Sequence, residues 1–406
     1  MCQDNSRKIP FSPPDVGEEE IEQIIEVIKS GWITTGPKTK EFEKAIGEYL
    51  GNPNVCCLNS QTACAEMALR LLEIGPGDEV IVPAYTYTAT ASVVCHVGAK
   101  LVMVDCKENS FEMDYSKVAE AITENTKAII PVDLAGIMCD YDKLYKIVDE
   151  KKALFKPNGR MQNAMKRIAI CADGAHAFGA SAFGVKCGNV ADFTSFSFHA
   201  VKNLTTGEGG ALVWKTIEGI DDEEVYRQLQ MFSLHGQTKD AFSKVKSGGW
   251  EYDIKGTWYK CNMTNISAAM GLAQLKKYDG FLKRRQEIIE KYNEAFIPMG
   301  IEVLEHFSKE RASSGHLYLT RIKGIGTTER QSIIDKMTER GISVNVHYKP
   351  LPLLSAYKEM GYDIKDYPNA YVLYQNEITL PLHTLLSDDD VEYVIKNYCE
   401  IVKEYI

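Results

Sequence analysis

The sequence lacks the features that mark membrane, secreted and nucleic-acid-binding proteins. No apolar run approaches the roughly 18 residues of a membrane-spanning helix. The opening residues, Met-Cys-Gln-Asp-Asn, contain no apolar core of a signal peptide. Basic residues are outnumbered 46 to 56 by acidic ones, so the net charge is −10, which argues against a surface that wraps nucleic acid. We therefore expect a cytoplasmic protein with no membrane or nucleic-acid partner.

Cysteine pairing motifs are also missing. The eleven cysteines are an odd number, none forms a Cys-x-x-Cys pair, and no histidine cluster lies near them with the spacing of a zinc site. This pattern favours a reduced protein in which cysteine is a small core residue, and it predicts no metal site. A redox or metal-binding protein is the alternative.

What is present is the composition of a globular protein: of 406 residues, 45% are hydrophobic and 25% are charged. Over the first two thirds of the chain, segments of helical periodicity alternate with short apolar segments. The predicted helices are 18–30, 42–50, 61–73, 88–97, 115–124 and 140–151, and the predicted strands are 79–83, 100–104, 127–132 and 168–172. This alternation predicts a mainly parallel sheet of about six or seven strands, covered by helices on both faces.

The remainder of the chain predicts a surface excursion and a second domain. Residues 152–167 are basic and rich in turn formers, which indicates a surface segment. A long helical region at 264–296, interrupted near Asp279-Gly280, leads into the second domain. There we expect a helix at 327–340, strands at 342–346 and 377–380, a Pro-rich loop at 350–352, and a last helix that opens with a capping box at Ser387.

The strongest local signal is the string at 195–210, Ser-Phe-Ser-Phe-His-Ala-Val-Lys-Asn-Leu-Thr-Thr-Gly-Glu-Gly-Gly. A strand ends near Phe198, Lys202 follows, and a glycine-rich turn leads into a strand at 211–214. A lysine held on a turn between buried strands is partly desolvated, which lowers its pKa and suits it to Schiff-base chemistry. The alternative is a surface lysine beside a hairpin. The flanking Ser, His and Gly-Glu-Gly-Gly argue against this alternative.

A second signal is an acidic residue at the end of a strand. Asp173 closes the apolar run Ile-Cys-Ala-Asp at 170–173 and is followed by a small-residue turn that contains His176. Ligands of open α/β sheets bind at the carboxyl ends of strands, where an aspartate could hold a protonated ring nitrogen. Taken alone, Asp173 is better explained as a turn cap; together with Lys202 it indicates a site.

Two weaker signals accompany these. Asn-Ser-Gln-Thr-Ala at 59–63 is a turn rich in hydroxyls and amides before a helix, and a helix N-terminus with free N–H groups can bind phosphate, although ordinary N-capping explains it as well. Tyr87 stands at the end of the strand 79–83 and could stack on a planar ring, although core packing is the simpler reading of a lone aromatic.

The order of these pieces resembles one family, the DegT/DnrJ/StrS sugar aminotransferases. These are pyridoxal 5′-phosphate (PLP) enzymes with the aspartate aminotransferase fold. The resemblance runs from Ser-Gly-Trp-Ile-Thr-Thr-Gly-Pro at 30–37 to Leu-Pro-Leu-His at 380–383, and the string at 196–210 is its most specific part. It implies an α/β fold with a large, mainly parallel, seven-stranded PLP-binding domain at 1–279 and a smaller α+β C-terminal domain at 280–406.

The resemblance also implies roles for individual residues. Lys202 matches the Schiff-base lysine and general acid/base, and Asp173 matches the acid that pairs with the pyridine nitrogen. The remaining cofactor positions are matched by Thr62, Ala63, Tyr87, His176, Ser197 and Lys260. The expected substrate contacts are His199, near where the sugar enters, and His347 and Tyr348 in the loop 346–350; domain packing is an equal explanation of that loop.

Family members share their active sites between two subunits, so the resemblance implies a homodimer in which Lys260 reaches the cofactor phosphate of the other copy. The family usually has Asn-Tyr/Phe-Arg where this chain has Lys-Cys-Asn at 260–262. A lysine still binds phosphate as a point charge. The family also often has glycine at the position of Gln61, which bears on the geometry of the phosphate turn.

The expected reaction moves the amino group of L-glutamate to a nucleotide-linked ketosugar by a ping-pong mechanism, with pyridoxamine 5′-phosphate as the intermediate form of the cofactor. The histidine at 199 resembles members that act on 4-ketosugars, so a UDP- or dTDP-linked 4-keto-(6-deoxy)sugar is the predicted acceptor. A 3-ketosugar aminotransferase is the alternative. A sugar dehydratase replaces the lysine with histidine, so Lys202 argues against it. A non-catalytic regulator need not keep the site, and the presence of Lys202, Asp173, Thr62 and Ser197 together argues against it.

Overall fold

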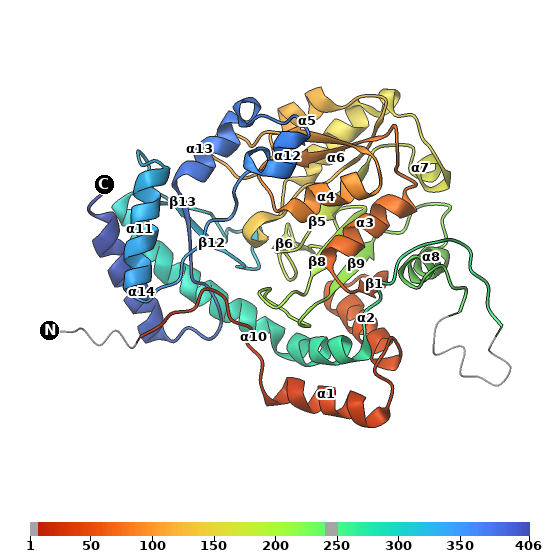
Figure 1. Cartoon of the computed structure of the whole chain (residues 1–406), viewed down its shortest axis with the longest axis horizontal. Coiled ribbons are helices and arrows are strands. Elements are labelled where there is room, and N and C mark those ends of the chain that lie inside the picture. Colours follow the sequence, from red (N-terminus) through yellow and green to blue (C-terminus); the bar gives the residue numbers. More distant parts are fainter. Residues whose placement is uncertain (1–6, 240–250) are drawn as a thin grey trace.

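The computed structural model of the chain describes residues 7–239 and 251–406. In Figure 1 a large α/β unit lies on the right and a smaller unit on the left, and one long helix, α10 (Asn265–Phe296), runs along the lower side of both. Helix α1 (Glu18–Ser30) lies beneath α10 and packs against it.

The large unit is built on a seven-stranded sheet with the order β1-β9-β8-β5-β4-β2-β3. Its strands are β1 (Val55–Leu58), β2 (Glu79–Pro83), β3 (Lys100–Val104), β4 (Thr126–Ile129), β5 (Ala169–Asp173), β8 (Phe193–Ser197) and β9 (Gly210–Trp214). Strand β9 is antiparallel to both of its neighbours, and the other pairs are parallel. The predicted mainly parallel sheet is thus confirmed.

Helices cover both faces of this sheet. They are α2 (Pro37–Leu50), α3 (Gln61–Leu71), α4 (Thr88–His96), α5 (Tyr115–Ala121), α6 (Tyr141–Glu150), α7 (Arg160–Met165) and α8 (Asp222–Ser233), with 3₁₀ turns at Leu134–Gly136 and Lys152–Leu154. Successive residues of β1 enter opposite cores: Cys56 and Leu58 belong to one apolar cluster, and Val55 and Cys57 to the other. Burial on both faces explains why β1 is apolar throughout.

Two local predictions in the large unit differ from the structure. Helix α1 forms, but the expected apolar stripe is largely exposed, since Ile21, Ile25 and Ile28 are 42–58% accessible. The segment 152–167 lies at the surface but is anchored: it forms α7, whose Met161 is buried, and Gln162 Nε2 donates a 2.6 Å hydrogen bond to the carbonyl oxygen of Leu72.

Helix α10 (Asn265–Phe296) is continuous, so the predicted interruption at Asp279-Gly280 is wrong. Both residues face solvent, where a glycine costs a helix only about 1 kcal/mol relative to alanine. Tyr278, just before them, packs in the sheet core, whereas Ile288 packs in the core of the small unit. The helix therefore serves both units, and the predicted division between residues 279 and 280 lies within it.

The small unit consists of an antiparallel three-stranded sheet, ordered β10-β12-β13, with its own apolar core. Its elements are β10 (Glu302–Val303), β12 (Tyr318–Arg321), β13 (Glu377–Leu380), α11 (Thr327–Glu339), α12 (Ser355–Glu359), α13 (Pro368–Asn376) and α14 (Asp388–Val402), with 3₁₀ turns at Ile297–Met299, Leu351–Leu353 and Ile364–Asp366. Strand β11 (Arg311–Ala312) pairs with β6 (Ser181–Ala182), which pairs with β7 (Val185–Lys186).

The predicted strand at 342–346 does not form. The segment makes two isolated bridges to different partners, one from Ile342 to Ile9 and one from Asn345 to Thr379, so no continuous ladder holds it extended. The capping box at the start of α14 is confirmed, because Ser387 Oγ accepts a 3.1 Å hydrogen bond from the Asp390 N–H. In the described ranges 7–239 and 251–406, no helix has both the length and the apolar character needed to cross a bilayer.

Candidate active site

A cavity lies where the carboxyl end of β5 meets the loops after β2 and β8 and the start of α3. The cavity is narrow, with a volume of about 40 Å³. It is lined by Gln61, Thr86, Tyr87, Ala89, Val132, Asp173, Ala175, His176, Lys202 and Tyr348. Five of the residues predicted from the sequence thus line one cavity, namely Asp173, Lys202, Tyr87, His176 and Tyr348.

Asp173 supplies a buried carboxylate. It ends β5 and is 5% exposed. The hydroxyl of Thr90 donates to Asp173 Oδ2 at 2.7 Å, and the Ala175 N–H donates to Oδ1 at 3.1 Å. Burial raises the pKa of Asp173, while these hydrogen bonds and the charge of Lys202 oppose the rise. Both hydrogen-bond donors are neutral, so the carboxylate is prepared for a cationic partner in the cavity.

Lys202 supplies an amine to the same cavity. It follows β8 on a tight turn, in which its N–H donates to the His199 carbonyl oxygen at 2.9 Å. Removal from water lowers the pKa of Lys202 to about 8, and the charge of Asp173 acts against this shift. An amine with a pKa near neutrality is deprotonated at low cost, as nucleophilic and general-base roles require.

Two buried histidines pack beside Lys202. His176 and His316 have ring centroids 4.3 Å apart. The Ala135 N–H donates to His176 Nδ1 at 3.2 Å, and His176 Nε2 lies 3.1 Å from the hydroxyl of Tyr348. Burial holds the pKa of both imidazoles well below the ordinary value, so both are neutral. The sequence reasoning missed His316, which has no motif of its own.

The N-terminus of α3 forms the third wall. Ser60 caps the helix by accepting a 3.1 Å hydrogen bond from the Ala63 N–H. Gly210 allows this turn to approach the sheet, because a Cβ there would lie 2.5 Å from the Gln61 backbone nitrogen. Ser197 pairs in register with Gly210, so its hydroxyl-bearing side chain belongs to the same corner. A helix N-terminus with neighbouring hydroxyls suits a phosphate group.

Several polar residues near the cavity were not found from the sequence. Thr90 binds Asp173, and Gln61 Nε2 donates to Ser195 Oγ at 2.9 Å beneath the α3 turn. Gln61 was noted only as a departure from the family. The run Tyr-Thr-Tyr-Thr-Ala-Thr at 85–90 is rich in hydroxyls, and that composition was the available signal for Thr90.

Six predicted residues lie outside the cavity lining: Thr62, Ala63 and Ser197 at the α3 corner, and three others. His199 is exposed, and its Nε2 is 3.7 Å from a carboxylate oxygen of Glu208. His347 packs behind Tyr348, with its Nδ1 3.0 Å from Thr379 Oγ1. Lys260 is exposed on a segment that runs beside the end of β1, where the Asn59 N–H donates to the Cys261 carbonyl oxygen at 2.8 Å. Their roles stay predictions.

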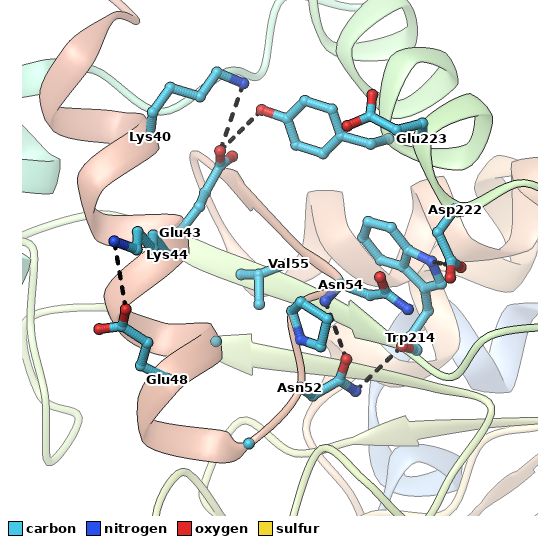
Figure 2. A pocket seen from close by; sticks show the side chains of 14 residues that line it. Lys40, Glu43, Lys44, Glu48, Asn52, Asn54, Val55, Trp214, Asp222 and Glu223 are labelled. Carbon is cyan, nitrogen blue, oxygen red and sulfur yellow. Dashed lines mark hydrogen bonds and ion pairs between the residues drawn. The ribbon is translucent and has the colours of Figure 1, made fainter.

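A second hollow lies at the other end of β1, between α2 and α8 (Figure 2). Glu43 projects from α2 beside Lys40 and accepts a 2.8 Å hydrogen bond from the Tyr226 hydroxyl. The Cys57 N–H also donates to Glu43, at 3.0 Å, and burial raises the pKa of this carboxyl to about 7. These contacts tie α2 and α8 to β1, so the polar groups of this hollow serve the fold.

Comparison with known proteins identifies the family. Residues 14–398 match the family model described as the DegT/DnrJ/EryC1/StrS aminotransferase family. The chain belongs to this family. The protein SpsC of Bacillus subtilis strain 168, named for spore coat polysaccharide biosynthesis, is 37% identical over 409 residues, which is 99% of each chain.

Solved structures agree with the family assignment. Spr1654 of Streptococcus pneumoniae, whose name assigns it provisionally to the sugar aminotransferases, superposes in its PMP form with a TM-score of 0.96 at 53% identity, over 98% of this chain and 100% of that one. It also exists in a PLP form, with a TM-score of 0.95 at 52% identity over the same shares. PseC of Helicobacter pylori, an aminotransferase of pseudoaminic acid biosynthesis, superposes with a TM-score of 0.86 at 26% identity, over 98% and 100%.

The residues of the cavity fit the PLP of this family. Asp173 is a buried carboxylate hydrogen-bonded by neutral donors, Lys202 is an amine with a lowered pKa, and the α3 N-terminus is a ready anion site. The predicted family and aspartate aminotransferase-like fold are confirmed, and the chain is a PLP-dependent transaminase.

Proposed function

We propose that this transaminase transfers the amino group of L-glutamate to a nucleotide-linked ketosugar, most specifically a UDP- or dTDP-linked 4-keto-(6-deoxy)sugar, in two half-reactions at one site. The observation that carries the proposal is the placement of the Lys202 amine and the Asp173 carboxylate on one cavity beside a helix N-terminus. The names of SpsC, Spr1654 and PseC, each tied to sugars or polysaccharides, support a sugar as the acceptor.

Each residue of the cavity has a task in this reaction. When bound, PLP supplies the carbonyl that carries the amino group and the ring that accepts an electron pair. Lys202 Nζ takes a proton from the substrate carbon that bears the amino group and later returns one. The Asp173 carboxylate holds a proton on the ring nitrogen, which keeps that ring electron-poor. At neutral pH, a pKa of about 8 leaves a useful fraction of Lys202 in the neutral form.

The surrounding residues bind and orient. The first turn of α3, with Thr62 and the Ala63 N–H, together with Ser197, binds the phosphate, and the Ala63 N–H exchanges its bond to Ser60 Oγ for one to the phosphate. Tyr87 is 59% exposed at the edge of the cavity, and its ring centroid lies 5.7 Å from that of Tyr348. These two rings form the wall on which a planar group stacks. We propose that His199 and His347 contact the sugar nucleotide as it arrives.

We further propose a homodimer in which Lys260 of one copy contacts the cofactor phosphate of the other, acting in the cytoplasm. Lys260 is exposed and stands on the segment that borders the phosphate turn, so its surface is available to a second copy. The cysteines at ten described positions are free, which suits a reducing compartment.

The acceptor is tested with the PLP-loaded enzyme, L-glutamate and a panel of UDP- and dTDP-linked 4-keto and 3-keto sugars. Release of 2-oxoglutarate beyond one equivalent per site requires that the sugar accepts the amine. We expect sustained release with a 4-ketosugar and none with Lys202→Ala. Sustained release with 3-ketosugars alone would refute the 4-keto assignment, and activity with none of the panel would refute the nucleotide-sugar proposal.

A further inference from the structure

His316 lies against Lys202, although it comes from the segment that enters the small unit. Its Nε2 is 3.5 Å from Lys202 Nζ, and the imidazole is 5% exposed. Hydrogen bonds of catalytic groups are often long in structures without substrate and shorten on loading. The proton of this hydrogen bond belongs either to His316 Nε2 or to Lys202 Nζ, and the other atom is then the acceptor.

The partners of His316 decide its tautomer. Asn203 Nδ2 donates a 2.7 Å hydrogen bond to the Ser314 carbonyl oxygen, so the amide oxygen of Asn203 is the atom that faces His316. That oxygen lies 2.9 Å from His316 Nδ1 and can only accept. Nδ1 therefore carries the proton, and Nε2 presents a lone pair to Lys202.

His176 has the opposite tautomer. Its Nδ1 accepts from the Ala135 N–H at 3.2 Å, so its proton is on Nε2 and is directed to the Tyr348 hydroxyl at 3.1 Å. Two adjacent imidazoles, tilted by 43° to each other, thus have fixed and different roles. His176 donates toward the cavity wall, and His316 accepts from the lysine.

We propose that His316 is a positioning residue for Lys202, whose amine donates a hydrogen bond to the unprotonated Nε2 and is thereby aimed into the cavity. One consequence is orientation, because one N–H of the amine is held and the lone pair of neutral Nζ is directed toward bound reactants. The other is electrostatic, because an acceptor stabilises the ammonium form. The proposal rests on the proposed role of Lys202.

The charges around this pair keep His316 neutral while Lys202 titrates. Arg285, from α10, donates to the carbonyl oxygens of Gly315 and His316 at 3.1 and 3.4 Å. Burial is the main cause that lowers the pKa of His316, and His176, Lys202, Arg285 and His347 add to it. Asp173 is the negative group that faces Lys202.

The test measures how fast full-length apo-enzyme captures PLP at different pH values. Nζ adds to the aldehyde carbon of PLP and water leaves, so Nζ must be neutral, and the rate follows its deprotonation. Stopped-flow absorbance from about pH 6 to 10 gives a midpoint, which reports the pKa of Lys202, and a plateau, which reports orientation. Borohydride reduction followed by peptide mass analysis shows whether the bond is on Lys202.

We expect His316→Leu to lower the midpoint by about one pH unit, a tenfold change in the ammonium-to-amine ratio, and to slow the plateau rate several-fold. His316→Gln keeps an acceptor oxygen and should recover most of both values. Asn203→Leu frees the tautomer and should shift the midpoint in the same direction as His316→Leu. His306→Leu is the control, since His306 is a buried histidine bonded to Ser313 Oγ at 3.0 Å and should keep the wild-type profile.

Wild-type midpoints and plateaus in both His316→Leu and Asn203→Leu would overturn the proposal. If His316→Leu does not fold, Asn203→Leu decides: a lowered midpoint supports the proposal, and a wild-type midpoint and plateau overturn it. Failure of the wild-type apo-enzyme to form a reducible bond on Lys202 would overturn the proposed function, and with it this inference, and is a separate observation from a shifted profile.

Discussion

The hydrogen bond from Thr90 to Asp173 offers a quantitative test of the site, through the substitution Thr90→Val. The Thr90 hydroxyl donates to Asp173 Oδ2 at 2.7 Å and lies 2.8 Å from Thr86 Oγ1. Valine has nearly the same shape, so the substitution leaves the packing in place and removes the hydroxyl, with its bonds to Asp173 and Thr86. A hydrogen bond to a charged group contributes about 1.5–3 kcal/mol, which corresponds to about 1–2 pKa units at 1.36 kcal/mol per unit.

The direction of the pKa change follows from the ionisation state of Asp173 that the hydrogen bond from Thr90 favours. The bond stabilises the carboxylate and opposes the rise in the pKa of Asp173 caused by burial, so its loss raises that pKa further. As the pH is lowered, Asp173 is then protonated earlier, and activity that needs its carboxylate is lost at a higher pH. The acid limb of the pH profile of kcat/KM should therefore move up by about 1–2 pH units. Thr90→Ser keeps the hydroxyl and should keep the limb. An acid limb in Thr90→Val that matches wild type would refute the assignment of Asp173.

Further predictions concern the electron sink and the packing of α10. Asp173→Asn should still bind PLP but turn over on the order of 10²–10³-fold more slowly, as for loss of one group that stabilises developing charge; spectrophotometric cofactor content and kcat together check this, and unchanged kcat contradicts it. Gly271→Ala should destabilise the protein by about 1–3 kcal/mol, since the new Cβ would meet the ring of Phe42. Gly280→Ala, on the same helix with no atom within 4 Å of the new Cβ, should stabilise it by about 0.5–1 kcal/mol. Urea denaturation measures both, and equal shifts would contradict the packing.

The parts of the fold that local patterns determine were predictable from the sequence. The strand at 79–83 is mostly apolar because both of its faces are buried, and the capping box at Ser387 marks the start of the last helix. The break at Asp279-Gly280 was wrong because packing on both sides of a solvent-facing glycine outweighs its helix propensity. The strand at 342–346 was wrong because its partners are two separate segments.

The candidate site also contains residues that were predictable from the sequence and residues that were not. Lys202 and Asp173 could be found because each follows a strand in a recognisable string. Thr90 and His316 could not, because the contacts that give them meaning span 83 and 114 residues of sequence. His316 shows this most clearly, since its role depends on a tautomer fixed by Asn203, a residue with no motif significance of its own.

The most direct test of the central claim is to locate the lysine that binds the cofactor. The purified protein is incubated with PLP, reduced with borohydride, digested and analysed by mass spectrometry. The account predicts a single phosphopyridoxyl group on Lys202, which disappears when L-glutamate is added before reduction and is absent from Lys202→Ala. A stable adduct on another lysine, or none in the wild-type protein, would contradict it.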